Sequence, residues 1–449
     1  MIQLTEYTYD VVVIGSGASG TSVAFETRAA GLSVAIVEER SWGGTCVLRG
    51  CDPKKVLVGA AEARNFSKRL RGKGIKQAAT ISWSDLMAFK ETFVENVPEQ
   101  RLQSFQEAGI ETFFGKAQFQ SKETLLVGED LLHAENIVLA TGASPNKQDI
   151  PGNDFILTSD DFLSLKHLPD SVTFIGGGYI SFEFASIALA AGKEVHIIHH
   201  NSNPLKKFDP DFVAALVSLM EEEGVHFHFD TTISKVEKKA EKLQISGEND
   251  FVLQTDNIIG ATGRTPNISH LDLEKAHIDY TKKGITVNEK LQTVSNPHIY
   301  ACGDVAATKG APLTPVVSME AAIVSQNILG ADDAIHYPVI PSVVFTSPKL
   351  ASIGITIQEA KEQPAKYQIK NHDTTNWYTY KRTNEPLALA KIIVDKSNQQ
   401  IKGAHFLSEE ADYMINYIAI LMKANLTLSD LQSVLFAYPS PASDLSALN

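Results

Sequence analysis

Cysteine is scarce in this chain, with three residues among 449. That content excludes the small secreted domains that rely on several disulfides for stability. The N-terminal residues lack the basic-then-apolar layout of a signal peptide. We therefore expect a cytoplasmic protein, in which a lasting disulfide would be catalytic.

The chain also lacks long apolar runs and a net positive charge. No stretch approaches 18 consecutive apolar residues, so we expect no membrane partner. The formal net charge is −13, which argues against binding to nucleic acid. Hydrophobic residues make up 43% of a chain that is too long for a single core, and about three domains are expected. We expect no bound metal.

Two of the three cysteines, Cys46 and Cys51, lie close together with four residues between them. In a chain of this kind such a pair suggests a redox couple, although two unrelated buried thiols are the alternative. Five residues of regular helix rise about 7.5 Å, whereas the Cα atoms of a disulfide lie roughly 4.4–6.8 Å apart. The segment must therefore bend, and Gly50 gives it the freedom to do so.

A dinucleotide-binding signature precedes this pair. Residues 9–15 form an apolar strand that ends at Gly15, and Gly17 and Gly20 open a helix to about residue 31. Residues 33–38 form the next strand, which ends in Glu38. Glycines at this spacing let the backbone approach a pyrophosphate at the helix N-terminus, and Glu38 is expected to bind ribose hydroxyls.

The same plan recurs later in the chain. A strand at 172–175 leads into Gly176, Gly178 and Ser181, then into a helix and a strand at 195–198. Where the first unit has an acid, the second has His199 and His200, with Lys206 shortly after. These groups favour a 2′-phosphate, so we expect NADPH to be preferred, with NADH possible.

The remaining segments indicate an α/β protein with two Rossmann-like dinucleotide-binding domains and a C-terminal α+β dimerisation domain. We expect helices over 56–107, strands and a hairpin over 111–135, a strand at 137–142, a strand ending at Asp304, and a helix over 313–329. After residue 336 come strands at 338–353, 387–394 and 401–406, an apolar helix at 413–424 that is a candidate interface, and a short helix at 428–435. The predicted division is 1–145 and 273–337 for the first nucleotide domain, 146–272 for the second, and 338–449 for the interface domain.

These motifs together resemble the class I pyridine nucleotide–disulfide oxidoreductases, the family of glutathione reductase, dihydrolipoyl dehydrogenase and mercuric reductase. The resemblance covers nearly the whole chain. It implies FAD in the first fold, NAD(P)H in the second, and a homodimer. By the same resemblance Cys51 lies next to the flavin, Cys46 is the thiol that attacks substrate, and Lys54 or Lys55 pairs with Glu183.

The resemblance also implies the other cofactor contacts. Asp304 would hold the ribityl chain of FAD, and Tyr179 would cover the nicotinamide site. Further cofactor-binding positions carried over from the family are Ala18, Ser19, Gly44, Thr45, Lys55, Ala117, Thr141, Gly142, Ile180, Gly263, Arg264, Leu313 and Thr314.

One departure from the family concerns its acid–base pair. Members that reduce disulfides carry a His-Pro…Glu signature near the C-terminus, where this chain has Tyr438 at the histidine position and Ser443 or Asp444 at the acid position. A tyrosine with a pKa of about 10 transfers protons at neutral pH poorly compared with a histidine near 6.5.

The substrate-binding positions depart as well. Phe25 and Ala322 stand where glutathione reductases have arginines. Mercuric and large thioredoxin reductases require a second redox pair near the C-terminus, whereas no cysteine follows Cys302 in this chain. The chain is similar to the bacterial hypothiocyanous acid and reactive-chlorine defence branch, and our hypothesis is an NADPH-driven reductase of hypothiocyanous acid. The alternatives are a glutathione or other low-molecular-weight disulfide reductase, including dihydrolipoyl dehydrogenase, and a flavin redox sensor with little turnover.

Overall fold

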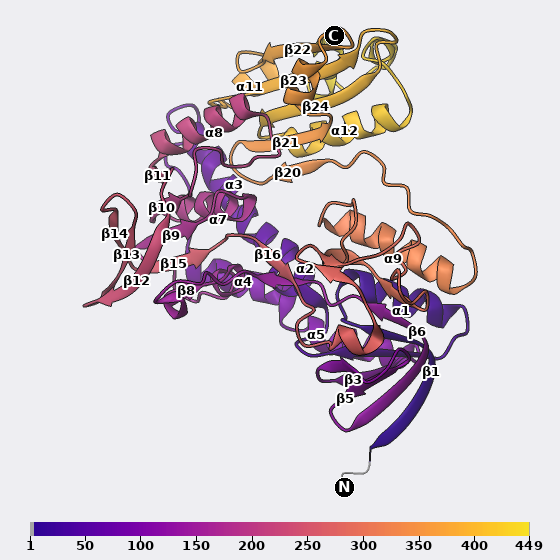
Figure 1. Cartoon of the computed structure of the whole chain (residues 1–449). Helices are drawn as coiled ribbons and strands as arrows, with labels where there is room; N and C mark the ends of the chain where they lie inside the picture. The colour runs from indigo at the N-terminus through magenta and orange to yellow at the C-terminus, as the bar shows by residue number, and fades with distance from the viewer. Residues whose placement is uncertain (1–3, 449) are drawn as a thin grey trace. The chain divides into compact units, whose positions relative to one another are not determined.

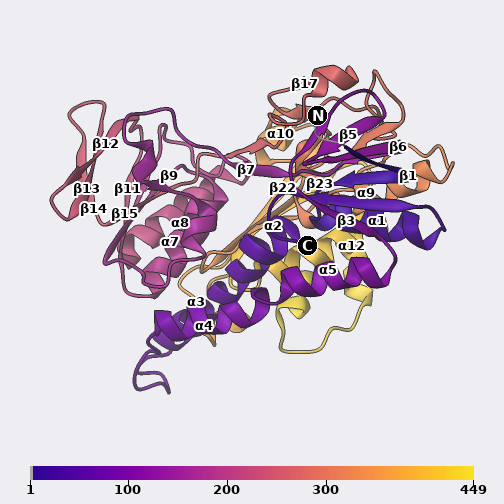
Figure 2. The same cartoon turned by 90° about the horizontal axis from the view of Figure 1, so that it is seen from below.

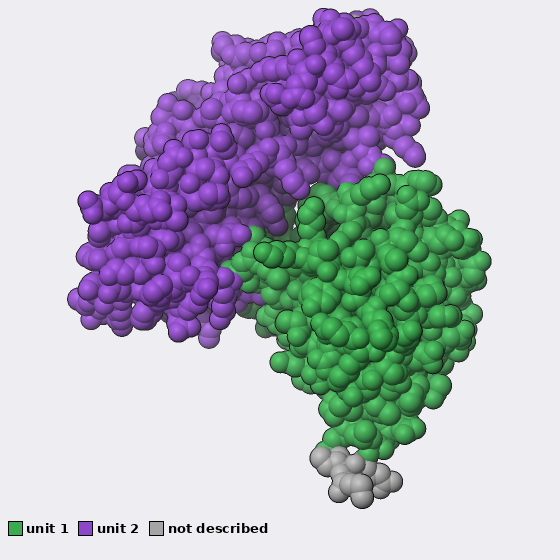
Figure 3. Space-filling view, viewed as in Figure 1, with its two compact units in different colours: residues 1–55, 88–146, 263–337 green, residues 56–87, 147–262, 338–449 purple. Residues whose placement is uncertain are grey.

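The computed structural model describes residues 4–448, so residues 1–3 and 449, which the predicted domain boundaries include, lie outside the described part. The chain forms two compact units (Figure 3). Unit 1 comprises residues 1–55, 88–146 and 263–337, and unit 2 comprises residues 56–87, 147–262 and 338–449. The finer division into four segments stays a prediction.

Unit 1 is built on a sheet whose strands follow the order β3-β2-β1-β6-β5-β4, with β19 also pairing with β6. The parallel strands are β1 (Thr5–Ile14), β2 (Val34–Glu38), β3 (Glu111–Phe114), β6 (Asp130–Leu139) and β19 (Ile299–Ala301). The antiparallel strands are β4 (Ala117–Phe119) and β5 (Thr124–Val127). The apolar run that predicted the first strand is fully buried at Val11, Val12 and Val13, as expected for a parallel strand covered on both faces.

Three helices cover one face of this sheet: α1 (Ala18–Ala29), α5 (Val97–Glu107) and α9 (Thr314–Ile328). The helices α1 and α9 lie side by side (Figures 1 and 2). Val23, Phe105 and Val324 from the three helices share one buried cluster with Val11 and Val13 of β1. Because α1 and α9 pack together, their N-termini lie in the same unit. Both N-termini are predicted to face the first cofactor.

The second dinucleotide fold lies in unit 2, on a parallel sheet ordered β11-β10-β9-β15-β8. Its strands are β8 (Ile156–Leu157), β9 (Ser171–Ile175), β10 (Glu194–Ile198), β11 (Val225–His228) and β15 (Asn257–Gly260). Helix α7 (Tyr179–Ala190) follows β9, and α8 (Pro210–Glu223) precedes β11. The predicted repeat of strand, glycines, helix and strand is therefore present.

The rest of unit 2 contains an antiparallel sheet in the order β20-β21-β24-β23-β22. Its strands are β20 (Ser342–Val344), β21 (Lys349–Gly354), β22 (Tyr367–Asp373), β23 (Leu389–Asp395) and β24 (Ile401–Ser408), and α12 (Ala411–Lys423) packs against it. The α+β prediction is confirmed, although β22 was not expected. The helix predicted at 428–435 is only a 3-10 turn over Ser429–Ser433.

The predicted helical stretch 56–107 is interrupted. It consists of α3 (Cys51–Arg69), α4 (Trp83–Val94) and α5, and the break between α3 and α4 contains Gly72 and Gly74 with positive φ angles. These are conformations that a helix cannot contain. None of the helices between residues 4 and 448 is long and apolar enough to cross a bilayer.

Candidate active site

The glycine loop of the first fold brings β1, α1 and β6 into close contact. Gly15 has a φ of +105°, and a Cβ there would overlap the carbonyl oxygen of Ala140. A Cβ at Gly20 would overlap the carbonyl of Gly15. Gly17 is the N-cap of α1, where the first backbone N–H groups of a helix point outward. The cradle suits a pyrophosphate, which binds at helix N-termini that the backbone can approach closely.

The acid at the end of β2 is held by a serine that sequence reasoning missed. Oε2 of Glu38 accepts hydrogen bonds from the backbone N–H of Ser16 at 3.0 Å and from its hydroxyl at 2.6 Å. The Ser16 Oγ in turn accepts a hydrogen bond from the backbone N–H of Gly43 at 3.0 Å. Because a carboxylate accepts about four hydrogen bonds, Glu38 keeps capacity for a ribose hydroxyl while also fixing the start of the redox segment.

The redox segment lies directly against the glycine loop. Gly43 and Gly44 have φ angles of +122° and +75°, and a Cβ at Gly44 would overlap the Cα of Gly17. Helix α2 (Gly44–Arg49) carries Cys46, and the chain then turns at Gly50 before α3 begins at Cys51. A Cβ at Gly50 would lie 2.9 Å from the carbonyl oxygen of Thr45. The bend that the cysteine spacing predicts is therefore present, and it needs glycine.

The structure brings the two predicted redox cysteines together as free thiols. The hydroxyl of Thr314, at the start of α9, lies 3.3 Å from the Sγ of Cys46 and 3.6 Å from the Sγ of Cys51. The hydrogen bond from Cys46, with help from Thr314 and the charge of Lys54, lowers the pKa of Cys51 to about 6. The same thiol–thiol hydrogen bond, followed by burial, raises the pKa of Cys46. The pair is thus polarised, with the thiolate on Cys51 and the proton on Cys46.

A second group of predicted cofactor residues gathers at the ends of β6 and β19. Asp304 lies in a 3-10 turn after β19, and burial raises its pKa while the charge of Arg264 opposes that shift. The hydroxyl of Thr141 donates to the carbonyl of Asn267 at 2.8 Å, and the Asn267 side-chain amide donates back to the Thr141 carbonyl at 2.8 Å. Gly142 has a φ of +66°. Asn267 was not predicted, since nothing in its local sequence marks it.

Other predicted positions lie in the same unit. Ala18 and Ser19 form the first turn of α1, and the Ser19 hydroxyl contacts the buried thiol of Cys302. Leu313 is the N-cap of α9. The last three predicted positions in this unit are Thr45 in α2, Lys55 in α3 and the buried Ala117 in β4.

The second glycine loop repeats the first. Gly176 has a φ of +126°, and a Cβ there would overlap the carbonyl of Ala261, as at Gly15. Gly178 is the N-cap of α7, of which Tyr179 and Ile180 are the first residues. Ser181 occupies the position of Gly20 and is fully buried, and its hydroxyl has no hydrogen-bond partner among residues 4–448. Serine is thus accommodated where the first fold allows only glycine.

The two histidines after β10 have different environments. Strand register makes His199 the counterpart of Glu38. Its ring is buried against the backbone of Gly177, and burial lowers its pKa. His199 is therefore a neutral packing residue at pH 7. His200 is exposed, as is Lys206, whose charge is close enough to contribute to the lowered pKa of His199.

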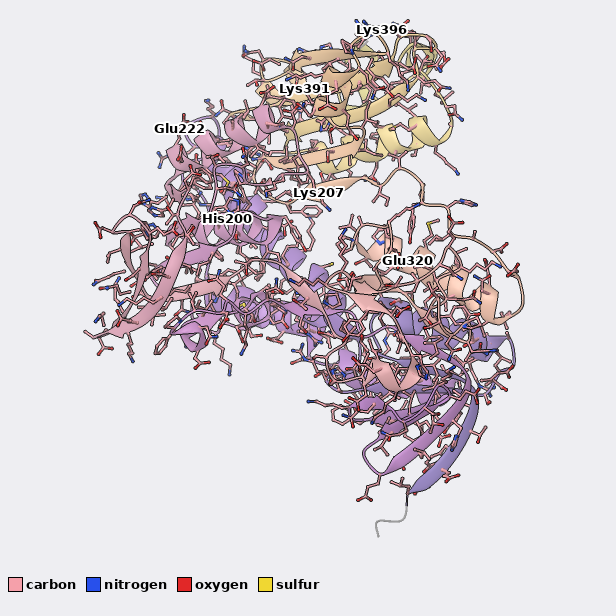
Figure 4. The ribbon with its side chains drawn as sticks, in the orientation of Figure 1. His200, Lys207, Glu222, Glu320, Lys391 and Lys396 are labelled. Atoms are coloured by element: carbon pink, nitrogen blue, oxygen red, sulfur yellow. The ribbon has the colours of Figure 1, made fainter. Side chains whose placement is uncertain are left out.

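A loop holds His200 and Lys206 beside the second glycine loop. The backbone N–H of Leu205 donates to the carbonyl of Gly177 at 2.8 Å, so the segment after β10 folds back onto the second glycine loop (Figure 4 labels His200 and Lys207 on this segment).

Two predicted cofactor residues, Gly263 and Arg264, belong to unit 1, where Arg264 donates to the carbonyl of Ala143.

The remaining predicted residues lie elsewhere. Glu183 is buried on α7 and accepts a hydrogen bond from the backbone N–H of Phe345 at 2.9 Å. Its pairing with Lys54 stays a prediction. Tyr438 is 80% exposed. Phe25 stacks on Phe105 with ring centroids 5.3 Å apart, so that position is a core aromatic and not an anion site. Across residues 4–448 no three histidine, cysteine, aspartate or glutamate side chains gather as a metal site would need.

Comparison with known proteins agrees with this geometry. The family model described as "Pyridine nucleotide-disulphide oxidoreductase" matches residues 9–326, and that of its dimerisation domain matches residues 340–447. A glutathione reductase of Burkholderia cepacia is 30% identical over 447 residues, with 99% of each chain covered. A mercuric reductase of Staphylococcus aureus is 32% identical, with 97% of this chain and 81% of the relative covered.

A comparison with solved structures also finds a flavoprotein disulfide reductase. The HOCl-induced flavoprotein disulfide reductase RclA from Escherichia coli superposes with a TM-score of 0.88 at 27% identity, covering 98% of this chain and 99% of that one. The two matching family models together cover nearly the whole chain. The chain therefore belongs to the pyridine nucleotide-disulphide oxidoreductase family, whose members are enzymes that use FAD and NAD(P)H.

Proposed function

We propose that this protein uses the Cys46–Cys51 dithiol to reduce a small thiol-reactive oxidant, hypothiocyanous acid, at the expense of NADPH. The observation that carries the proposal is the pair of free thiols, both within hydrogen-bond reach of the single hydroxyl of Thr314. Tyr438 at the family's histidine position supports it, because the reaction must then proceed without an imidazole acid–base.

The chemistry of this oxidant needs no such acid. The proton of Cys46 first passes to the neighbouring Cys51 thiolate, and the Cys46 thiolate attacks the sulfur of hypothiocyanous acid. The departing hydroxide takes that proton from Cys51 and leaves as water, which restores the Cys51 thiolate. Cys46 then carries a thiocyanate group. The Cys51 thiolate attacks the Cys46 sulfur, a Cys46–Cys51 disulfide forms, and thiocyanate leaves as an anion that requires no proton.

A thiolate leaving group differs from thiocyanate. With an unperturbed pKa of about 8.5 it leaves faster when protonated. Loss of an acid–base partner typically costs about 10²–10⁴-fold in rate. A disulfide reductase would suffer that loss, whereas a hypothiocyanous acid reductase would not.

The cofactor-binding residues fit this scheme. The cradle of Gly15, Gly17 and Gly44, with Glu38 and Asp304, would hold FAD, and the loop with Gly176, Gly178, His200 and Lys206 would hold NADPH. When bound, FAD supplies the two electrons from NADPH that return the disulfide to the dithiol. In this chain Thr314 and Lys54 hold the negative charge on Cys51 once the bond has opened.

The comparisons support an oxidant as substrate and a dimer as the working form. RclA is described as HOCl-induced, which links a structurally similar flavoprotein to thiol-reactive oxidants. The matched dimerisation domain supports a homodimer. In such a dimer we expect Tyr438 to shape the partner's oxidant site or to donate a hydrogen bond there.

The test is NADPH consumption by the purified flavoprotein with a panel of oxidants and disulfides at equal concentrations. We expect hypothiocyanous acid to be reduced fastest. The full-length similarity to glutathione reductase makes a disulfide reductase the second candidate. Faster turnover of glutathione disulfide or lipoamide would establish that second candidate and refute the proposal.

A further inference from the structure

Glu320 is a buried carboxylate on α9 to which no role has yet been assigned (Figure 4). Glu320 is only 2% exposed. Its carboxylate accepts three hydrogen bonds. The backbone N–H of Gly303 donates to Oε2 at 2.7 Å, and the hydroxyls of Thr308 and Tyr337 donate to Oε1 at 2.8 and 2.6 Å. A buried charge with this set of donors is held in a defined place.

Two of the three donors, Gly303 and Thr308, belong to the segment that joins the two predicted flavin contacts, and the third, Tyr337, follows α9. Gly303 directly precedes Asp304, and the loop that follows leads to Thr314 at the start of α9. The Thr308 hydroxyl also accepts a hydrogen bond from the backbone N–H of Gly310 at 3.2 Å. A Cβ at Gly310 would lie 3.0 Å from Oε1 of Glu320, so the loop is folded tightly around the carboxylate.

We propose that Glu320 is a positioning residue. By holding the loop between Gly303 and Thr314, its carboxylate keeps the Thr314 hydroxyl against the two thiols and keeps Asp304 in place. Glu320 lies six residues after Thr314 on one helix, about 9 Å along its axis, so anchoring one position anchors the other. This inference rests on the proposed dithiol function, because it concerns the hydroxyl that stabilises the Cys51 thiolate.

The sign of the effect separates positioning from plain electrostatics. Removing a buried negative charge should by itself make nearby thiols more acidic, and so lower the pKa of Cys51. Loosening the Thr314 hydroxyl should instead raise it, because a hydrogen bond to the thiolate is weakened. A merely structural role predicts no change in that pKa for a variant that stays folded.

The experiment measures the pH dependence of iodoacetamide alkylation at Cys51 in the full-length flavoprotein reduced to its dithiol form with one equivalent of NADPH, with the modified residue identified by mass spectrometry. In Glu320→Gln the amide offers one acceptor oxygen in place of two, so at least one donor loses its partner. We expect the Cys51 midpoint to rise by about one pH unit. In a Thr314→Val background Glu320→Gln should add nothing, because the two changes act through the same hydroxyl.

Two variants keep the result interpretable. Glu26→Gln removes an exposed carboxylate on α1 that bonds only to Ser22 in the described structure, and it should leave the midpoint unchanged. If Glu320→Gln does not fold, Thr308→Val removes one donor only and should shift the midpoint in the same direction. An unchanged or lowered midpoint in folded Glu320 or Thr308 variants overturns the positioning role. A wild-type midpoint near 8.5 overturns the proposed dithiol chemistry itself, and this inference with it.

Discussion

The shared hydroxyl of Thr314 gives the sharpest prediction about the thiol pair. Its Oγ1 lies 3.3 Å from the Sγ of Cys46 and 3.6 Å from that of Cys51. Thr314→Val preserves the shape of the side chain and removes the hydroxyl. Hydrogen bonds to charged groups contribute about 1.5–3 kcal/mol, and the long contact to Cys51 favours the low end. Because one pKa unit corresponds to about 1.4 kcal/mol, the pKa of Cys51 should rise by about one unit.

That shift is measurable at neutral pH. With a pKa of about 6, Cys51 is mostly thiolate at pH 7, and a rise of about one unit would leave about half of it ionised. The assay is the rate of iodoacetamide alkylation at Cys51 as a function of pH. Thr314→Ser keeps the hydroxyl and is the matched control, for which we expect the wild-type midpoint. An unchanged midpoint in Thr314→Val, or an equal shift in both variants, would refute the role of the hydroxyl.

Three further predictions concern the dithiol, the nucleotide and stability. Cys46→Ser should abolish oxidant turnover while NADPH still reduces the flavin. Cys51→Ser should abolish turnover too, and it should in addition remove any thiolate–flavin charge-transfer absorbance. Unchanged turnover in either variant would contradict the dithiol mechanism. Alanine at Lys206 and His200 should raise the KM for NADPH more than that for NADH, and equal effects would mean that the 2′-phosphate is not read there. Burial lowers the pKa of His228 to about 4, below its value of 6.5 in an unfolded chain, so the unfolded state binds the proton first and stability falls as pH drops from about 6.5 to 4. Because His228 is only half-buried, solvent screening reduces the loss to about 1–2 kcal/mol, and urea unfolding of a His228→Gln variant should show a smaller pH dependence than wild type.

The fold was predictable because its signals are local. Gly15 and Gly176 each end a buried strand and begin a turn that no Cβ could occupy, and the structure repeats the same contact with Ala140 and Ala261. The bend between Cys46 and Cys51 follows from helix geometry alone. The pattern of an apolar strand ending in glycine and the spacing of the cysteines are both local, so the sequence contains them, although Ala140 and Ala261, which the glycines contact, are distant in sequence.

Parts of the site were not predictable because they depend on partners distant in sequence. Glu38 reads as a ribose ligand, yet part of its capacity is taken by Ser16, a variable position of the fingerprint. His199 and His200 are adjacent and chemically identical in the sequence. Only the packing of one ring on Gly177 distinguishes the buried neutral histidine from the exposed one.

The division of the long helical stretch was missed for a different reason. The sequence predicts helices over residues 56–107 without placing a break, but the chain turns after α3 at Gly72 and Gly74, which have positive φ angles. A glycine inside a helical pattern costs only about 1 kcal/mol, so its presence does not reveal whether the chain turns there. Tertiary packing decides that question.

The central claim is that a small oxidant is reduced by these two sulfurs acting in turn. The direct measurement reduces the flavoprotein with one equivalent of NADPH, so that the dithiol holds the only two reducing electrons, and then adds one equivalent of hypothiocyanous acid. The mixture is quenched by alkylation, and the state of each cysteine is determined together with the thiocyanate released. We predict one equivalent of thiocyanate, a disulfide between Cys46 and Cys51, and an unmodified thiol at Cys302. Consumption of the oxidant with both Cys46 and Cys51 still open to alkylation would contradict the account.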